Sequence, residues 1–156
     1  MIKKLYEFLE LQNSYNYSEV DNKFDSSKFS GNFKEFLFKA DDGERYWVLL
    51  HYYGKPDGIL KDITWSNEKD IGKFDKIDNL TSNTININIL FKIINTVFKI
   101  VFDFMDKENI KIAEIGSRNK NKFKLYKKSI SEEDNFEIIK EYIEKETYYI
   151  RFKKIK

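Results

Sequence analysis

The sequence predicts an α+β domain with a mixed, mostly antiparallel sheet and one long central helix. Two aromatic and β-branched runs, residues 33–40 and 45–53, flank Asp41-Asp42-Gly43-Glu44, a hairpin turn in which Gly43 can take positive φ at no steric cost. Apolar residues then recur every three or four positions between residues 88 and 105, and others lie on the remaining faces. This pattern predicts a helix packed on more than one side.

The elements around the hairpin follow from similar patterns. A short amphipathic helix is predicted at residues 2–11, followed by a polar surface loop at 12–32. After the hairpin, a turn at 54–58 leads to a third antiparallel strand at 59–65 and a second polar loop at 66–82. These elements place three antiparallel strands before the central helix.

Shorter elements follow the central helix. A strand is predicted at residues 109–116 and a basic helix at 118–130. Ser131-Glu132-Glu133-Asp134 resembles a helix start, but residues 136–144 fit a helix or a strand. An alternating strand at 148–155 closes the chain. With no internal repeat and no linker, residues 1–156 are predicted to form one domain.

The composition limits the class of protein. Hydrophobic residues make up 41% of the chain and aromatic residues 17%, which is enough for a packed core. The absence of cysteine excludes disulfides, thiolate nucleophiles and Cys-ligated zinc, and suits a reducing compartment. No signal-like or membrane-spanning apolar run is present, and the net charge is only +2. We therefore expect a cytoplasmic protein without a membrane partner.

The order of elements resembles that of the GCN5-related N-acetyltransferase (GNAT) family. In that family a strand often precedes an N-x-x-A-x-x-L-Y helix, and here Ile112-Ala113-Glu114-Ile115 precedes Asn119, with Leu125-Tyr126 six and seven positions later. The resemblance implies a GNAT-like topology over residues 33–154. It also implies acetyl-CoA as the cofactor and Tyr126 as the general acid that returns a proton to the CoA thiolate.

The family's phosphate-binding motif is missing. Members hold the CoA pyrophosphate on R/Q-x-x-G-x-G/A at the start of the central helix, where backbone N–H groups and the helix dipole bind the anion. Here Asn83-Thr84-Ile85-Asn86-Ile87-Asn88 stands before that helix without a glycine, and Lys122 replaces the small residue of the second motif. The sequence therefore favours a scaffold that can dock but not react, with no cofactor.

A softer resemblance links the chain to small uncharacterised phage and prophage proteins. It rests on a strand pair, a helix with Thr96-Val97 and Ile100, and a basic helix with Leu125-Tyr126. This resemblance implies a phage- or mobile-element-encoded protein, which would act in the host cytoplasm or in the virion.

The basic helix is the candidate binding element. Its predicted binding residues are Arg118, Asn119, Lys120, Lys122, Lys124, Lys127 and Lys128. Four of its cations crowd the first two turns, where each opposes the helix dipole by about 0.3–1 kcal/mol. Such a site suits an anionic partner, whereas a solvated lysine-rich face explains the same residues without a ligand.

No catalytic or metal-binding signature accompanies these residues. His51 is the only histidine, so it cannot form a multi-histidine metal site, and it lies within a strand, which favours a packed role. Tyr126 shares one face of the basic helix with Asn119, Phe123 and Ile130, which fits a core position as well as a catalytic one. No catalytic residue is predicted outside the acetyltransferase alternative, and no metal ligands are predicted.

Three function classes remain open at this point. We expect first a non-catalytic binding or assembly module that acts by protein–protein contact, with a protein partner or by self-assembly. The high aromatic content favours it, because interface cores are rich in Tyr, Trp and Phe. The alternatives are an N-acetyltransferase with an atypical acetyl-CoA site and a nucleic-acid-binding protein that uses residues 118–128.

Overall fold

The computed structural model describes residues 13–21, 23, 32–52, 58–71 and 86–155. Helices and strands alternate irregularly along the chain, as expected for an α+β fold. In order the elements are β1 (Tyr17–Val20), β2 (Asn32–Lys39), β3 (Arg45–Tyr52), β4 (Ile59–Leu60), β5 (Asp62–Asn67), the 3₁₀ turn η1 (Glu68–Asp70), α3 (Ile87–Glu108), β6 (Ile112–Ser117), α4 (Lys120–Ser131), β7 (Phe136–Glu144) and β8 (Thr147–Lys154).

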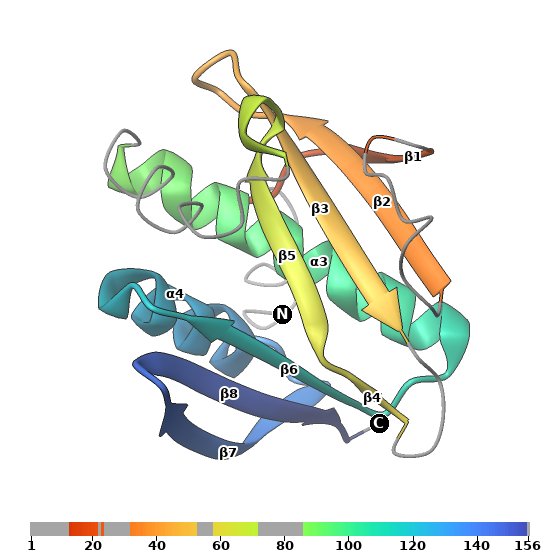
Figure 1. The fold of residues 1–156 in the computed structure, drawn as a ribbon, viewed down its shortest axis with the longest axis vertical. Coiled ribbons are helices and arrows are strands. Elements are labelled where there is room, and N and C mark those ends of the chain that lie inside the picture. The colour runs from red at the N-terminus through yellow and green to blue at the C-terminus, as the bar shows by residue number, and fades with distance from the viewer. Residues whose placement is uncertain (1–12, 22, 24–31, 53–57, 72–85, 156) are drawn as a thin grey trace, which may run out of the picture.

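The strands form two four-stranded sheets that share one chain segment. The first sheet has the order β1-β2-β3-β5 and is antiparallel throughout. The second has the order β4-β6-β8-β7, with β4 parallel to β6 and the other neighbours antiparallel. Only Lys61 separates β4 from β5, so residues 59–67 begin in one sheet and continue in the other. Beyond this junction β5 and β6 diverge (Figure 1).

Helix α3 forms the centre of the core. It crosses one face of the first sheet (Figure 1), and ten of its side chains are buried, including Ile93, Ile94 and Val97. The ring of Phe98 lies 5.6 Å from Tyr126 on α4 and 5.9 Å from Phe152 on β8. The amphipathic pattern thus reflects a helix that packs against both sheets and α4.

The strand β1 lies inside the segment that the sequence analysis assigned to a polar loop. It pairs with β2, and Tyr15, just before it, donates its backbone N–H to Thr96 Oγ1 on α3 at 2.8 Å. The prediction was wrong at residues 17–20 because Tyr-Ser-Glu-Val is short and half-polar, and its strand conformation depends on β2 and α3. The predicted helix at residues 2–11 lies outside the described residues.

Among the described residues the other predicted elements agree with the structure, apart from two local differences. Most of the turn predicted at 54–58 and of the loop predicted at 66–82 lies outside the described residues. The hairpin turn is confirmed, with Gly43 at φ 81°, as are the central helix, the basic helix and the last strand. The third strand is interrupted at Lys61, since its first two residues pair with β6 instead of β3. Residues 132–135 form a turn, not a helix start. Residues 136–144, which fitted a helix or a strand, form a strand.

Candidate functional site

The basic helix α4 begins with an asparagine cap. Asn119 accepts a hydrogen bond from the backbone N–H of Lys122 at 3.0 Å, and its own N–H donates to Ser117 Oγ at 3.0 Å. A side chain that accepts from the first turn satisfies one of the N–H groups that a helix start leaves unpaired. Asn119, a predicted binding residue, therefore has a structural role in starting the helix. Arg118 precedes the helix and is exposed.

Tyr126 lies in the core, at the junction of α4 and β5. Its side chain is 2% exposed, and its hydroxyl oxygen accepts a hydrogen bond of 2.8 Å from the indole N–H of Trp65. Trp65 is itself 4% exposed. The two side chains thus join β5 to α4 inside the core.

Lys122 is buried against the same tryptophan. Its side chain is 0% exposed, and its ammonium lies 4.5 Å from the centre of the Trp65 ring. A cation over an indole face is attracted by the ring's electron density, and this attraction is stronger away from water. This predicted binding residue is thus part of the packing between α4 and β5.

The remaining lysines of the basic helix face different surroundings. Lys120 and Lys124 are exposed, and Lys128 is exposed with its ammonium 4.7 Å from the centre of the Phe91 ring. Lys127 forms an ion pair with Glu141 on β7 at 3.0 Å. The structure therefore does not bring the seven predicted residues onto one surface, and anion binding there stays a prediction.

The outer face of the second sheet carries a polar and aromatic cluster that the sequence analysis missed. The Glu114 carboxylate is buried, and one of its oxygens accepts hydrogen bonds from Tyr142 Oη at 2.8 Å and from Arg151 Nε at 3.2 Å. Tyr142 also stacks on Tyr149, with 4.9 Å between ring centres. The alternation of side chains along β6, β7 and β8 was the signal available in the sequence. It could not show that these residues share one face without the register between the three strands.

The outer face of the first sheet holds two further buried polar contacts. Trp47 donates its indole N–H to Glu35 at 2.8 Å. His51 is buried, stacks on Phe33 with 3.8 Å between ring centres, and places Nδ1 3.3 Å from Asp62. The expected packed role of His51 is thus confirmed.

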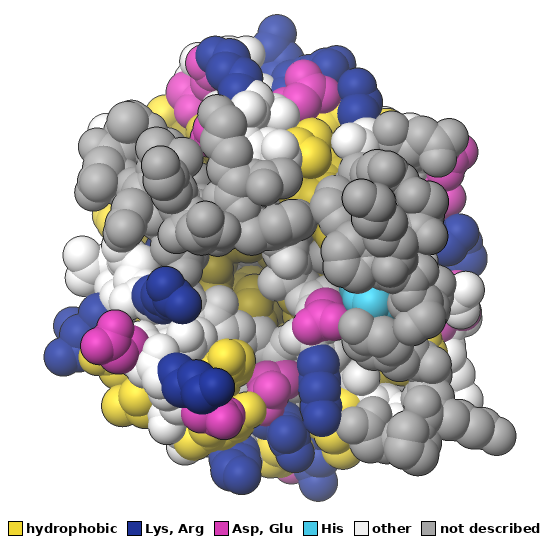
Figure 2. Space-filling model, viewed as in Figure 1, with side chains coloured by type: hydrophobic (Ala, Val, Ile, Leu, Met, Phe, Trp, Pro, Cys, Tyr) yellow, Lys and Arg dark blue, Asp and Glu magenta, His cyan; other side chains and the backbone are white. Residues whose placement is uncertain are grey.

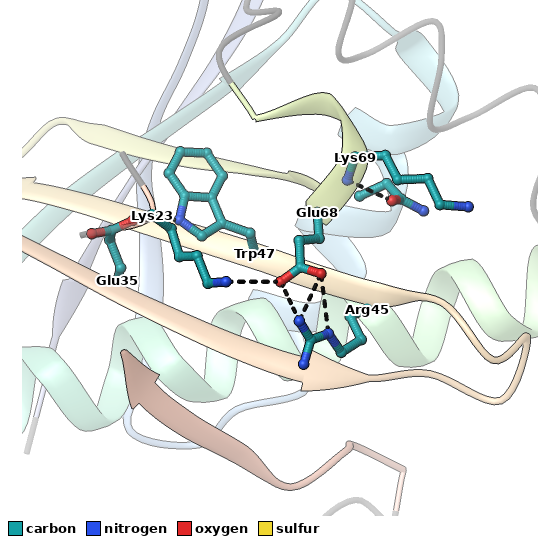
Figure 3. A network of polar contacts seen from close by, with 7 residues as sticks. Lys23, Glu35, Arg45, Trp47, Glu68 and Lys69 are labelled. Atoms are coloured by element: carbon teal, nitrogen blue, oxygen red, sulfur yellow. Dashed lines mark hydrogen bonds and ion pairs between the residues drawn. The ribbon is translucent and has the colours of Figure 1, made fainter. Parts of the chain in front are cut away.

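An ion-pair network closes one end of this face. Figure 3 shows Glu68 between Lys23 and Arg45, and Arg45 donates to both Glu68 oxygens at 2.7–3.1 Å. These hydrogen bonds lower the pKa of the Glu68 carboxyl, with burial opposing them. The network ties η1 to the start of β3.

A groove of about 230 Å³ lies between the first sheet and the second half of α3. Its apolar lining includes Phe36, Ile100 and Phe104. Tyr17 donates a hydrogen bond to Asp103 at its margin. Burial and this carboxylate raise the pKa of Tyr17, so the phenol stays neutral and the contact holds β1 on α3.

The described residues provide neither a metal-binding cluster nor a membrane-spanning helix. No three of their His, Cys, Asp or Glu side chains gather in a way that would hold a metal ion. None of the helices traced in those ranges has the length and apolar character to cross a membrane.

Comparison with known proteins adds no relative. No protein-family model, no curated protein and no solved structure matches this chain.

Proposed function

We propose that this chain is a non-catalytic binding or assembly module that acts by protein–protein contact on a GNAT-like scaffold. We further propose that it is encoded by a phage or mobile element and serves as a virion component or a host-directed factor. The origin rests on the resemblance of the Thr96-Val97 and Leu125-Tyr126 helices to small phage proteins.

The order of the strands supports the scaffold part of the proposal. Antiparallel strands β1, β2, β3 and β5 precede the long helix α3. The following strand β6 runs parallel to β4, and β8 then lies between β6 and β7. This strand order supports a GNAT-like scaffold, although a fold does not by itself carry an activity.

The hydrogen bond between Trp65 and Tyr126 is the observation that carries the non-catalytic part. A general acid must reach the group that it protonates within about 2.6–3.2 Å. The Tyr126 side chain is 2% exposed, its hydroxyl oxygen is bound by the Trp65 indole N–H, and the Lys122 ammonium lies over that same indole. These contacts favour a structural role for the tyrosine that the acetyltransferase alternative would use.

One observation favours that alternative. Figure 2 shows a recess between β5 and β6 with hydrophobic side chains at its bottom. A recess at the point where two strands diverge is a usual place for a ligand. The enzyme alternative therefore needs a direct test with its cofactor.

Thermal unfolding with and without millimolar acetyl-CoA provides this test. Under the proposal the melting temperature is unchanged, whereas a ligand at 100 times its Kd would stabilise the fold by about 2.7 kcal/mol. Inorganic phosphate serves as the control for plain anion binding. A shift with acetyl-CoA that phosphate does not reproduce, together with acetyl transfer that Tyr126→Phe abolishes, would overturn the proposal.

The nucleic-acid alternative has less support. Lys122 is buried and Lys127 is paired with Glu141, which leaves fewer cations for a phosphate backbone. Salt-dependent binding of an oligonucleotide that Lys120→Glu combined with Lys124→Glu abolishes would establish it instead.

A further inference from the structure

Strand β7 leaves one edge of the second sheet open. Its inner edge pairs with β8, and no strand in the described ranges pairs with its outer edge. In Figure 1 it lies at the lower rim of the molecule. Ile139 and Ile143 on this strand are 42% and 67% exposed, and they are two of the four large apolar side chains that are exposed among the described residues. An open edge with these side chains is a template for another strand.

The turn between β7 and β8 determines which backbone groups face the open edge. Lys145 and Glu146 both have positive φ, 48° and 67°, as in a two-residue type I′ turn. The pair next to such a turn, Glu144 and Thr147, is hydrogen-bonded, and hydrogen-bonded pairs then alternate along the hairpin. The backbone groups of Tyr142 therefore point to β8, and those of Glu141 and Ile143 point outward.

The charged residues of β7 favour a second copy of the same strand as its partner. Lys140, Tyr142 and Glu144 alternate onto the outer face of the sheet, where Tyr142 meets Glu114 and Tyr149. Glu141 lies on the opposite face, beside Lys127 of α4. On the outer face, β7 thus carries Lys140 and Glu144 on either side of Tyr142. This pattern of charges is complementary to its own copy in the antiparallel direction.

We propose that β7 pairs antiparallel with β7 of a second copy of this chain, with the two Tyr142 residues opposite each other. A two-fold axis perpendicular to the sheet then passes between the tyrosines, and the second sheet continues from one copy into the other. In this register Lys140 of each copy faces Glu144 of the other. Glu141 and Ile143 exchange the backbone hydrogen bonds.

The neighbouring symmetric registers are unfavourable. A two-fold axis preserves the faces of the sheet, so residues of like parity must face each other. Centring the pair on Lys140 places two lysines opposite each other, and centring it on Glu141 does the same with two glutamates. Like charges directly opposite are destabilising. Centring on Ile143 brings Glu141 against Lys145, which has left the extended conformation for the turn.

The tyrosine at the centre is already held in place. Its hydroxyl donates to Glu114, its ring stacks on Tyr149, and the Lys140 ammonium lies 4.9 Å from its ring centre. Pairing therefore requires little reordering of these side chains. The irregular register between Ile138 and Lys140 ends the straight part of the strand, which limits the contact to residues 140–144. We expect a weak, concentration-dependent dimer, because so short a pairing is small for a stable interface.

This inference gives the proposed protein–protein contact a partner and a surface, but it does not depend on the absence of catalysis. Acetyl-CoA binding by a dimer would remove the proposed function and leave the β7 pairing intact. A chain that stays monomeric and does not bind acetyl-CoA would remove the β7 pairing and leave the proposed function intact.

Sedimentation equilibrium of the full chain, from low micromolar to millimolar concentration, provides the first measurement. The expected result is a reversible monomer–dimer equilibrium without higher species. A chain that stays monomeric at millimolar concentration would overturn the inference, as would open-ended assembly, since pairing on a two-fold axis closes after two copies.

Charge exchange at Lys140 and Glu144 provides the specific test. Lys140→Glu alone and Glu144→Lys alone each place like charges opposite each other twice, so each should weaken the dimer at least about tenfold. The two single variants mixed together should form a heterodimer, and the double variant should recover the wild-type Kd. A dimer that the single variants leave unchanged rules out this register.

Matched variants separate pairing from folding. Lys111→Glu makes the same charge change at an exposed site away from β7 and should leave the dimer intact. Ile143→Pro removes one outward N–H while the hydrogen bonds to β8 remain, so it should abolish the dimer and keep the melting temperature of the dilute protein. Loss of dimer in Lys111→Glu as well would show that net charge, and not this edge, controls association.

Discussion

Tyr149 lies directly over Gly116, the residue opposite it on the neighbouring strand. A Cβ atom at Gly116 would come within 2.7 Å of two carbon atoms of the Tyr149 ring and 3.1 Å from the Thr147 methyl group. The glycine thus makes room for the ring that stacks on Tyr142. The outer face of the second sheet depends on the absence of one side chain.

Gly116→Ala should therefore lower the free energy of unfolding by about 1–3 kcal/mol, the usual range for an overpacked site. Urea titration measures this change. Tyr149→Ala removes the two closest contacts and leaves only the Thr147 methyl group, so adding Gly116→Ala to it should cost less. An equal loss in both backgrounds would show that the ring is not the obstacle.

The contact between Trp65 and Tyr126 can be measured by a double-mutant cycle. Tyr126→Phe leaves the buried indole N–H without this acceptor and should cost about 1–3 kcal/mol of unfolding free energy. Trp65→Phe should cost a similar amount, and the double variant less than the sum. Additive losses by chemical denaturation would indicate that the two side chains are not coupled.

Asn119 should stabilise the fold through its cap. Asn119→Ala removes the acceptor for the Lys122 N–H and is expected to cost about 1 kcal/mol, whereas Asn119→Asp keeps it. Asn121→Ala, two residues further along the chain and exposed, is the matched control with little effect. Thermal unfolding of the three variants gives the ranking, and equal losses at 119 and 121 would exclude the cap.

Tyr142 should make stability fall at high pH. Burial, and then the hydrogen bond to Glu114, raise the pKa of Tyr142 to about 12. A phenol with its ordinary pKa near 10 in the unfolded chain ionises there first. Its contribution is therefore complete below pH 10 and is lost as the pH rises toward 12.

Urea unfolding of dilute protein as a function of pH detects this loss. Tyr142→Phe should show a shallower decline above pH 10 than the wild type, with the remaining slope due to other buried tyrosines such as Tyr46, whose pKa burial also raises. Parallel curves would mean that Tyr142 titrates normally.

The sequence predicted those elements whose signal is local. The hairpin around Gly43 and the repeat of apolar residues in the central helix are each encoded in a short, continuous stretch of sequence, and both are confirmed. Tyr17–Val20 carries no such signal, because its strand conformation arises from β2 and from a helix some eighty residues away. The break at Lys61 also depends on a distant partner, β6.

The candidate site was less predictable than the fold. A lysine on an amphipathic helix is counted as a surface residue, and only the position of Trp65 shows that Lys122 is buried. The role of Asn119 was within reach, since asparagine before a helix is a preferred cap. Tyr142, Tyr149 and Arg151 gather around Glu114 only once three strands have their register.

The parallel pairing of β4 with β6 affects how the chain folds during synthesis. Leu60 is 0% exposed and pairs with Ala113, which follows it by 113 − 60 = 53 residues. Strands β2, β3 and β5 can pair before the rest of the chain has been synthesised, because each of these pairings joins strands that are neighbours in the sequence. Leu60 can pair and become buried only after β6 has been synthesised. We therefore expect a nascent chain that stops before β6 to expose the apolar strand β4, which a chaperone could bind.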